Sequence, residues 1–170
     1  MKTLVNHIVR FIGLILLQVL VLNHIGFLGR FTPYLYLYIL LVLPMDMNRS
    51  VVLLLAFCTG MVMDIFSNTA GMHTSACLLL AFIRPAVLGY QNSREQFEGT
   101  RPGIITLGLK GFVSYVMILV LVHHILLLWL EVFTWTGVFS ILFRALFNAL
   151  LTGGLIIAVE VIFAKSPVRR

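Results

Sequence analysis

Three ionisable side chains lie inside strongly apolar stretches of this sequence: Asp64, Arg84 and Arg144. A charged side chain in the middle of a membrane span costs about 2.5–3.5 kcal/mol on insertion scales, so such residues mark ion pairs, partner contacts or proton-transfer sites. Because intramembrane charges usually pair inside the bundle, we favour a structural role. Partner binding or gating comes second, and catalysis or proton transfer comes last.

The sequence lacks the residue patterns that enzymatic chemistry requires. It contains no GxSxG, no HExxH, no P-loop and no GxGxxG. The two aspartates, Asp46 and Asp64, fall at different depths of the predicted membrane and cannot share a proton. His123 and His124 point about 100° apart on a helix, and we interpret them, like His73, as buried or interfacial residues. We therefore predict no enzyme, no metal and no cofactor.

The elements that position these residues must be membrane helices. The 170 residues are 61% hydrophobic and 11% charged, whereas soluble domains are roughly 45–50% apolar and about 25% charged. This composition excludes an ordinary soluble enzyme and a disordered chain. The net charge of +6 does not indicate nucleic acid, because basic residues of membrane proteins gather on cytoplasmic flanks. Cys58 and Cys77 have no CxxC spacing and are interpreted as packing residues.

We predict one integral membrane domain over residues 1–170, an all-α compact bundle of about six transmembrane helices. A span needs about 20 mostly apolar residues. The candidate spans are 8–28, 33–47, 50–67, 70–90, 108–131 and 137–164. The first lacks a small-residue cleavage site, so we interpret it as a retained span and not as a signal peptide.

The second span, 33–47, is the weakest, because a helix from Pro33 to Pro44 would cover only about 17 Å. It must tilt, thin the bilayer or lie partly buried between its neighbours. Its YLYLY start alternates as a strand would, but an open strand edge cannot lie in lipid. The long polar connection is 91–107.

The basic residues predict that both termini are cytoplasmic. With that orientation, nine of the twelve flank the inner side, one lies in an outer loop, and Arg84 and Arg144 lie within spans. The inner nine are Lys2, Arg10, Arg49, Arg94, Arg101, Lys110, Lys165, Arg169 and Arg170, and the outer one is Arg30.

Depth in the membrane predicts which charges pair. Asp64 lies about 21 Å above the inner end of its span, and Arg144 lies about 10 Å below the outer end of its own. In a core about 30 Å thick these depths are nearly equal. We therefore predict an ion pair between Asp64 and Arg144, supported by Asn148 one turn away. Arg84, only about 9 Å above the inner boundary, reaches inner carbonyls or snorkels to the headgroups.

Small residues mark candidate packing surfaces. Gly60 lies four residues before Asp64, and Gly153–Gly154 lie in the sixth span. Within a bilayer, such residues let helices approach closely. We predict that these two faces contact neighbouring helices, including those of a partner protein.

The stretch 60–73, GMVMDIFSNTAGMH, resembles the signature of the rod shape-determining protein MreD family. In that family a glycine is followed four residues later by an aspartate at the end of a span, and another glycine opens the next helix. Gly60, Asp64 and Gly71 hold these positions here.

Other features extend this resemblance, best over about 31–90. They are the Phe82-Ile83-Arg84-Pro85 sequence, the short second span, the total length and the layout with almost no loops. In the last third, the points of agreement are Arg144, Asn148 and Thr152.

The resemblance implies a non-enzymatic, multi-pass subunit of the bacterial cell-wall elongation machinery, which acts in cell shape determination in the inner membrane. Members of the family work with the bitopic protein MreC and, indirectly, with the actin-like MreB filament, the glycosyltransferase RodA and its transpeptidase partner. Membrane lipids would surround such a subunit, and no nucleic acid is implied.

The family fold is similar to the substrate-binding subunit of energy-coupling-factor vitamin transporters, which supplies the alternative function. Such a subunit should have an outer pocket lined by polar groups from long loops. The predicted outer loops, 29–33, 67–70 and 132–137, are short, which argues against this alternative.

Overall fold

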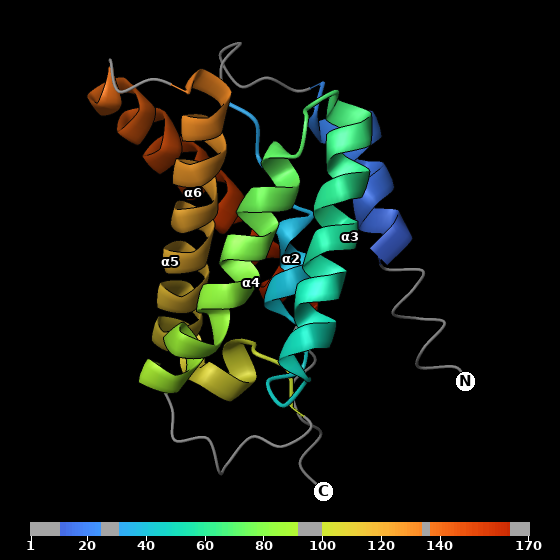
Figure 1. The fold of residues 1–170 in the computed structure, drawn as a ribbon. Helices are drawn as coiled ribbons and strands as arrows, with labels where there is room; N and C mark the ends of the chain where they lie inside the picture. The colour runs from blue at the N-terminus through green and yellow to red at the C-terminus, as the bar shows by residue number, and fades with distance from the viewer. Residues whose placement is uncertain (1–10, 25–30, 92–99, 134–136, 164–170) are drawn as a thin grey trace, which may run out of the picture.

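The computed structural model describes residues 11–24, 31–91, 100–133 and 137–163, and they are mostly helical (Figure 1). A short apolar helix, Phe11–Leu22, ends in a π-helical segment, η1 (Gln18–Leu22), and is followed by the five-residue helix α2 (Leu37–Leu41). The long helices are α3 (Arg49–Ser67), α4 (Met72–Gln91), α5 (Ile104–Val132) and α6 (Val138–Phe163).

These four long helices are long and apolar enough to cross a membrane. They occupy the predicted spans 50–67, 70–90, 108–131 and 137–164. The expectation of an all-helical chain with several membrane-length helices is therefore confirmed for the described residues. The helix Phe11–Leu22 lies within the predicted first span, whose two ends fall outside the described residues.

Consecutive long helices pack side by side, α3 on α4, α4 on α5 and α5 on α6 (Figure 1). The connections after α3 and after α5 are short and use residues with a left-handed backbone, whereas the connection from α4 to α5 is longer. Asn68 (φ 54°) and Gly71 (φ 81°) turn the chain between α3 and α4, and Gly137 (φ 79°) precedes α6. We call the end of the bundle with these turns the outer end, following the predicted topology, and the opposite end the inner end.

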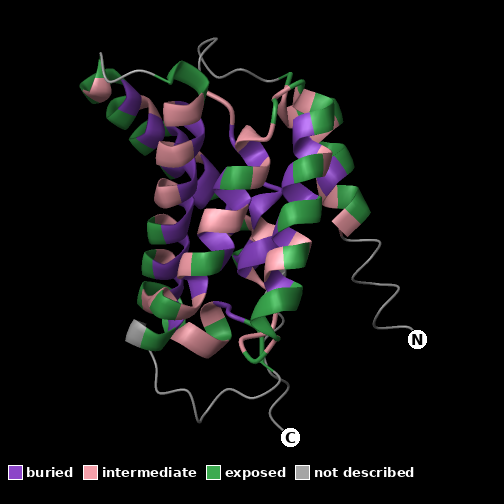
Figure 2. Cartoon of the chain, viewed as in Figure 1, coloured by how far each residue is buried: buried purple, intermediate pink, exposed green. Residues whose placement is uncertain are grey.

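The surface of the bundle is apolar. Figure 2 shows buried residues on the faces turned toward the bundle centre and exposed residues on the outward faces. Several outward side chains are large hydrophobes, among them Phe139, which is 89% exposed, and Phe82, which is 74% exposed. An apolar surface of this extent marks contact with lipid or with another protein.

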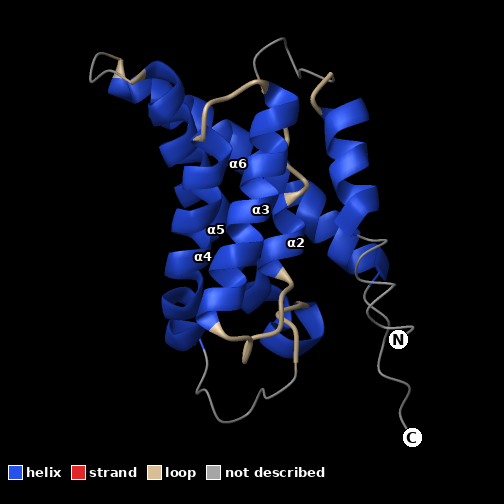
Figure 3. Ribbon diagram, turned by 45° about the vertical axis from the view of Figure 1, so that its right-hand side comes forward, coloured by secondary structure: helices blue, strands red, loops and turns tan. Residues whose placement is uncertain are grey.

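The predicted second span departs most from the structure. Of residues 33–47 only Leu37–Leu41 are helical, so the prediction of a membrane-spanning helix there is wrong. Pro33 and Pro44 bound the segment, and proline interrupts a helix because it lacks an N–H and restricts the residue before it. Residues 31–47, which we call the central segment, run through the centre of the bundle (Figure 3). Irregular backbone is tolerated at membrane depth where protein buries it.

Candidate functional site

Polar side chains replace the missing helical hydrogen bonds before α2. Asn148 Oδ1 accepts a hydrogen bond from the backbone N–H of Thr32 (3.1 Å), and Thr152 Oγ1 accepts one from the N–H of Tyr34 (3.0 Å). Buried backbone groups need such partners. Asn148, which we predicted to support an ion pair, therefore holds the central segment in place.

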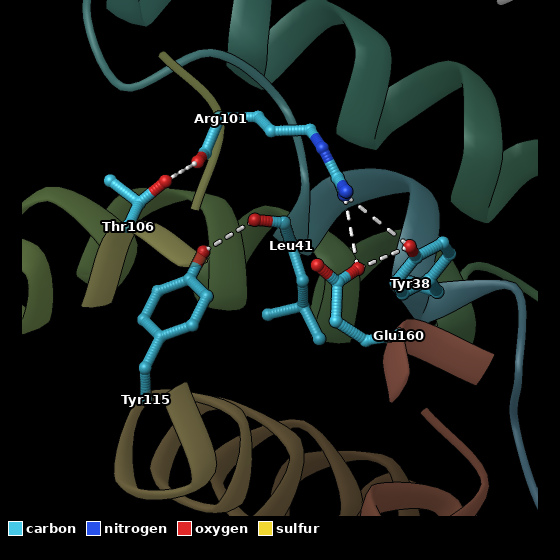
Figure 4. A network of polar contacts seen from close by, with 6 residues as sticks. All are labelled: Tyr38, Leu41, Arg101, Thr106, Tyr115 and Glu160. Atoms are coloured by element: carbon cyan, nitrogen blue, oxygen red, sulfur yellow. Dashed lines mark hydrogen bonds and ion pairs between the residues drawn. The ribbon is translucent and has the colours of Figure 1, made fainter. Parts of the chain in front are cut away.

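Arg84 and Tyr115 do the same after α2. The Arg84 guanidinium donates to the carbonyl oxygens of Leu43 and Pro44, and its Nε donates to the Tyr115 hydroxyl (3.0 Å). Tyr115 in turn donates to the carbonyl of Leu41 (2.8 Å; Figure 4). Arg84 is only 2% exposed. We predicted that Arg84 either binds carbonyl groups near the inner end or extends to the lipid headgroups. The first prediction is confirmed and the second is wrong.

Asp64 binds the start of α4. Its Oδ1 accepts hydrogen bonds from Thr69 Oγ1 (2.6 Å) and the N–H of His73 (2.9 Å). Its Oδ2 accepts from the N–H and the hydroxyl of Thr74 (3.0 and 2.6 Å). The first N–H groups of a helix lack partners, and the helix dipole favours a negative charge there. The predicted ion pair with Arg144 is therefore wrong, because α4 occupies both carboxylate oxygens.

Arg144 contacts a different carboxylate. Its Nη2 lies 3.6 Å from Glu131 Oε2, and its Nε is buried without a hydrogen-bond partner among the described residues. Asp64 and Arg144 do lie at the same end of the bundle, as their predicted depths indicated. Thr69 and His73, which bind Asp64, line the same cavity as Arg144. Depth alone could not give the direction in which each side chain leaves its helix.

A buried cluster around Tyr36 lies between α4 and α5. The Tyr36 hydroxyl is 3.0 Å from His73 Nδ1 and 3.1 Å from His123 Nε2, and the Cys77 thiol lies 3.8 Å away. His123 Nδ1 is buried without a partner among the described residues. An orphaned N–H is less tolerable than an unpaired acceptor. We therefore assign the proton of neutral His123 to Nε2, so that Tyr36 donates to His73 Nδ1 and the His73 proton is on Nε2.

His124 is held in a fixed tautomer. Its Nδ1 lies 2.8 Å from the carbonyl oxygen of Val120, which can only accept, so Nδ1 carries the proton. Its Nε2 then accepts from the Thr152 hydroxyl (3.3 Å). His123 and His124 are both fully buried, as predicted. Within the described part of the chain, no group of three or more His, Cys, Asp or Glu residues is placed to hold a metal ion.

A cavity of about 490 Å³ opens near the outer end. The short outer loops had predicted no polar outer pocket. Ends of helices and the start of the central segment supply the lining instead, so long loops are not required. The lining residues are Val19, Asn23, His24, Thr32, Tyr34, Phe66, Ser67, Thr69, Met72, His73, Leu127, Leu128, Glu131, Arg144 and Asn148.

A second polar cluster lies near the inner end (Figure 4). Glu160 Oε2 accepts hydrogen bonds from the Tyr38 hydroxyl (2.6 Å) and from Arg101 Nη1 (3.0 Å), and Glu160 is 1% exposed. Gly103 makes room for this carboxylate, since a Cβ there would lie 2.6 Å from Glu160 Oε1. Burial alone would lower the pKa of Arg101, but the hydrogen bond and charge of Glu160 raise it above its ordinary value.

The predicted packing glycines have three different environments. A Cβ at Gly60 would lie 2.7 Å from the backbone nitrogen of Thr74, so Gly60 packs inside the α3–α4 hairpin and its predicted partner contact is wrong. Gly153 also faces inward, where its Cβ would lie 2.5 Å from Met117 Sδ. Gly154 faces open space, and Gly71 is a turn residue.

The sequence reasoning missed Gln18, Tyr36, Tyr115 and Glu160. Gln18 is fully buried, and its side chain bonds the carbonyl of Pro33 (2.9 Å). A signal was present for two of them, because Gln18 and Glu160 are polar residues inside predicted apolar spans. The two tyrosines gave no such signal, since tyrosine is also a common interfacial residue.

In comparisons with protein-family models, curated proteins and solved structures, nothing matched this chain significantly.

Proposed function

We propose that this chain is a non-enzymatic, multi-pass subunit of the bacterial cell-wall elongation machinery, similar to MreD, that acts in cell shape determination. In this proposal it lies in the cytoplasmic membrane with both termini cytoplasmic. The helix Phe11–Leu22 and the central segment, which crosses the bundle mostly as irregular backbone, complete a six-pass bundle similar to the energy-coupling-factor type. The chain binds an MreC-like single-span protein and, through it, acts with MreB, RodA and the transpeptidase.

One observation carries this proposal: the residues that resemble the MreD signature act together in the fold. Gly60 lets α3 approach the backbone of α4, and Gly71 makes the turn. Asp64 accepts three hydrogen bonds from the start of α4 and a fourth from Thr69 in the turn. A carboxylate with this many donors is stabilised in its charged form and is poorly suited to proton transfer. The motif therefore builds a hairpin, which supports a scaffold and not an enzyme.

Of the glycines on the two faces expected from sequence, Gly60 and Gly153 are buried, so only Gly154 is available to a partner. The outward face of α6 offers Gly154 and Ala158, which are both exposed and four residues apart, beside exposed Leu150 and Val161. Small residues at this spacing let a second transmembrane helix approach closely. We assign the contact with the MreC-like protein to this face.

Capture of that partner tests the proposal. Gly154→Leu and Ala158→Leu should each reduce recovery of an MreC-like protein from native membranes, while the amount of folded chain stays normal. Gly89→Leu is the matched control, since Gly89 is also exposed on a helix and a Cβ added there would meet nothing within 4 Å. Depletion of the chain from a rod-shaped host should make the cells round. Rod-shaped depleted cells with unchanged partner capture would contradict the proposal.

A second candidate function has one specific observation in its favour. The outer cavity, lined by polar and apolar groups, is a feature that a transporter's substrate-binding subunit requires. A thermal-shift screen of the purified chain with vitamins tests this alternative. Stabilisation by one vitamin, together with loss of its uptake in depleted cells of normal shape, would favour transport over scaffolding.

A further inference from the structure

The outer cavity has the dimensions and the mixed lining of a ligand site. Its volume of about 490 Å³ falls within the range of about 300–1,000 Å³ that is typical of small-molecule pockets. One part of the lining is apolar, including Phe66, Met72 and Leu127, and another part is polar, including Arg144, Asn148 and His73. A ligand that fills it would combine an apolar body with one polar group.

Arg144 is the incompletely satisfied cation of this cavity. Its contact with Glu131 is 3.6 Å long, and its Nε is buried with no hydrogen-bond partner in the described part of the chain. The guanidinium is a planar fork of donors that matches the two oxygens of a carboxylate or phosphate group. Arg144 therefore has donors to offer to an oxyanion.

Two further side chains with N–H donors line the same cavity as Arg144. His73 and Asn148 are each 3% exposed, and both line the cavity. Tyr36 occupies His73 Nδ1, and the tautomer assigned above leaves an N–H at Nε2 that no described residue accepts. Asn148 uses its oxygen to bind the N–H of Thr32, and no described residue accepts from its amide nitrogen. Both side chains line the cavity, so their N–H groups can donate to an acceptor-rich ligand that enters it.

Glu131 is the group that such a ligand would displace. Its side chain is 51% exposed, and exposed ion pairs contribute little to stability. We propose that the outer cavity binds an oxyanion, a carboxylate or phosphate group on an apolar body, which replaces Glu131 against Arg144 and accepts hydrogen bonds from His73 and Asn148. This inference goes beyond the proposed function, because it requires no partner protein.

Titration of the purified full-length chain in phosphatidylcholine nanodiscs tests the proposal. The probes are phenyl phosphate and benzoate, with benzamide and benzylamine as neutral and cationic controls of similar size. We expect saturable binding of the two anions and none of the controls. Arg144→Gln should weaken anion binding about tenfold or more, because it removes a charged donor. Glu131→Gln should strengthen anion binding, because it removes the competing carboxylate.

The remaining arms identify the source of the oxyanion and guard against misfolding. Arg49→Gln is the matched control, since Arg49 is exposed at the start of α3, away from the cavity lining, and should bind the probes as the wild type does. Native mass spectrometry of chain extracted in mild detergent tests a lipid source. Phospholipid that is retained by the wild type and lost in Arg144→Gln identifies a lipid headgroup, whereas anion binding without such lipid identifies a soluble ligand.

Two results overturn the proposal. The first is that neither probe binding nor lipid retention depends on Arg144, and the second is that Glu131→Gln weakens anion binding while the variant unfolds at the wild-type temperature. These measurements use the isolated chain, so they are independent of partner capture and cell shape, on which the proposed function depends.

Discussion

Arg84 and Arg144 both lie in apolar helices, but their surroundings are opposite. Arg84 is 2% exposed and donates to the carbonyls of Leu43 and Pro44 and to Tyr115. The Arg144 side chain is 31% exposed, lies 3.6 Å from Glu131, and has a buried Nε without a partner among the described residues. An arginine in an apolar helix can therefore have its donors satisfied at one end of a bundle and keep an unpaired donor at the other.

The largest loss of stability should follow removal of Asp64, because its carboxylate accepts hydrogen bonds from the first N–H groups of α4. Asp64→Ala leaves the N–H groups of His73 and Thr74 without acceptors. Each buried unpaired donor costs about 1–3 kcal/mol, so we expect a loss of about 3–5 kcal/mol in the free energy of unfolding. Denaturation by SDS in mixed micelles, followed by circular dichroism, measures it.

A double-mutant cycle provides the control. Asp64 and Arg144 share no hydrogen-bond partner among the described residues, so Asp64→Ala and Arg144→Leu should add within about 0.5 kcal/mol. A coupling energy well above that value would indicate that Asp64 and Arg144 interact directly, as the sequence predicted.

Arg84→Met should give the next largest effect, about 2–4 kcal/mol, because it removes the donors to the Leu43 carbonyl and to the Tyr115 hydroxyl in the bundle interior. Arg84→Lys should recover only part of the loss, since an ammonium group lacks the fork that serves several acceptors. The same denaturation measurement applies, and Arg144→Met is the matched comparison. Equal losses for Arg84→Met and Arg144→Met would remove the distinction between the two ends.

The sequence predicted the parts of the fold that depend on position along a helix. Hydropathy located the four long helices, and depth placed Arg84 near the inner end of the bundle, with inner carbonyls as one of its two expected destinations. The sequence did not predict the irregular backbone around α2. That backbone is stabilised by side chains distant in sequence, such as Asn148 and Thr152. The partner of Asp64 was also missed, since depth does not specify the direction of a side chain around the bundle.

The cavity was missed for a related reason. Loop lengths predict pockets built from loops, whereas this one is lined by ends of helices from distant parts of the chain. Likewise, Gly60 and Gly153 indicate that another helix approaches closely, but the sequence does not show whether that helix belongs to the same chain.

Gly60→Ala and Gly154→Ala compare an inward with an outward glycine. The added methyl group at Gly60 meets the backbone of Thr74, which cannot rotate away, so we expect a loss of about 1–3 kcal/mol. At Gly154 the methyl group meets nothing, so alanine should be neutral or stabilise the helix by up to about 1 kcal/mol. SDS denaturation of both variants distinguishes them, and equal effects would contradict the packing described here.

The smallest effect on stability should come from Glu131→Gln. Its contact with Arg144 is long, and the Glu131 side chain is 51% exposed. Because water and ions screen such a pair, it should contribute only about 0–1 kcal/mol to stability. We expect the free energy of unfolding to change by less than about 1 kcal/mol, in contrast to the loss at Asp64. A loss of several kcal/mol would mean that Glu131 completes the partners of Arg144, and the outer end would then resemble the inner one. If the stability is unchanged, the fold does not require Glu131 to neutralise the charge of Arg144.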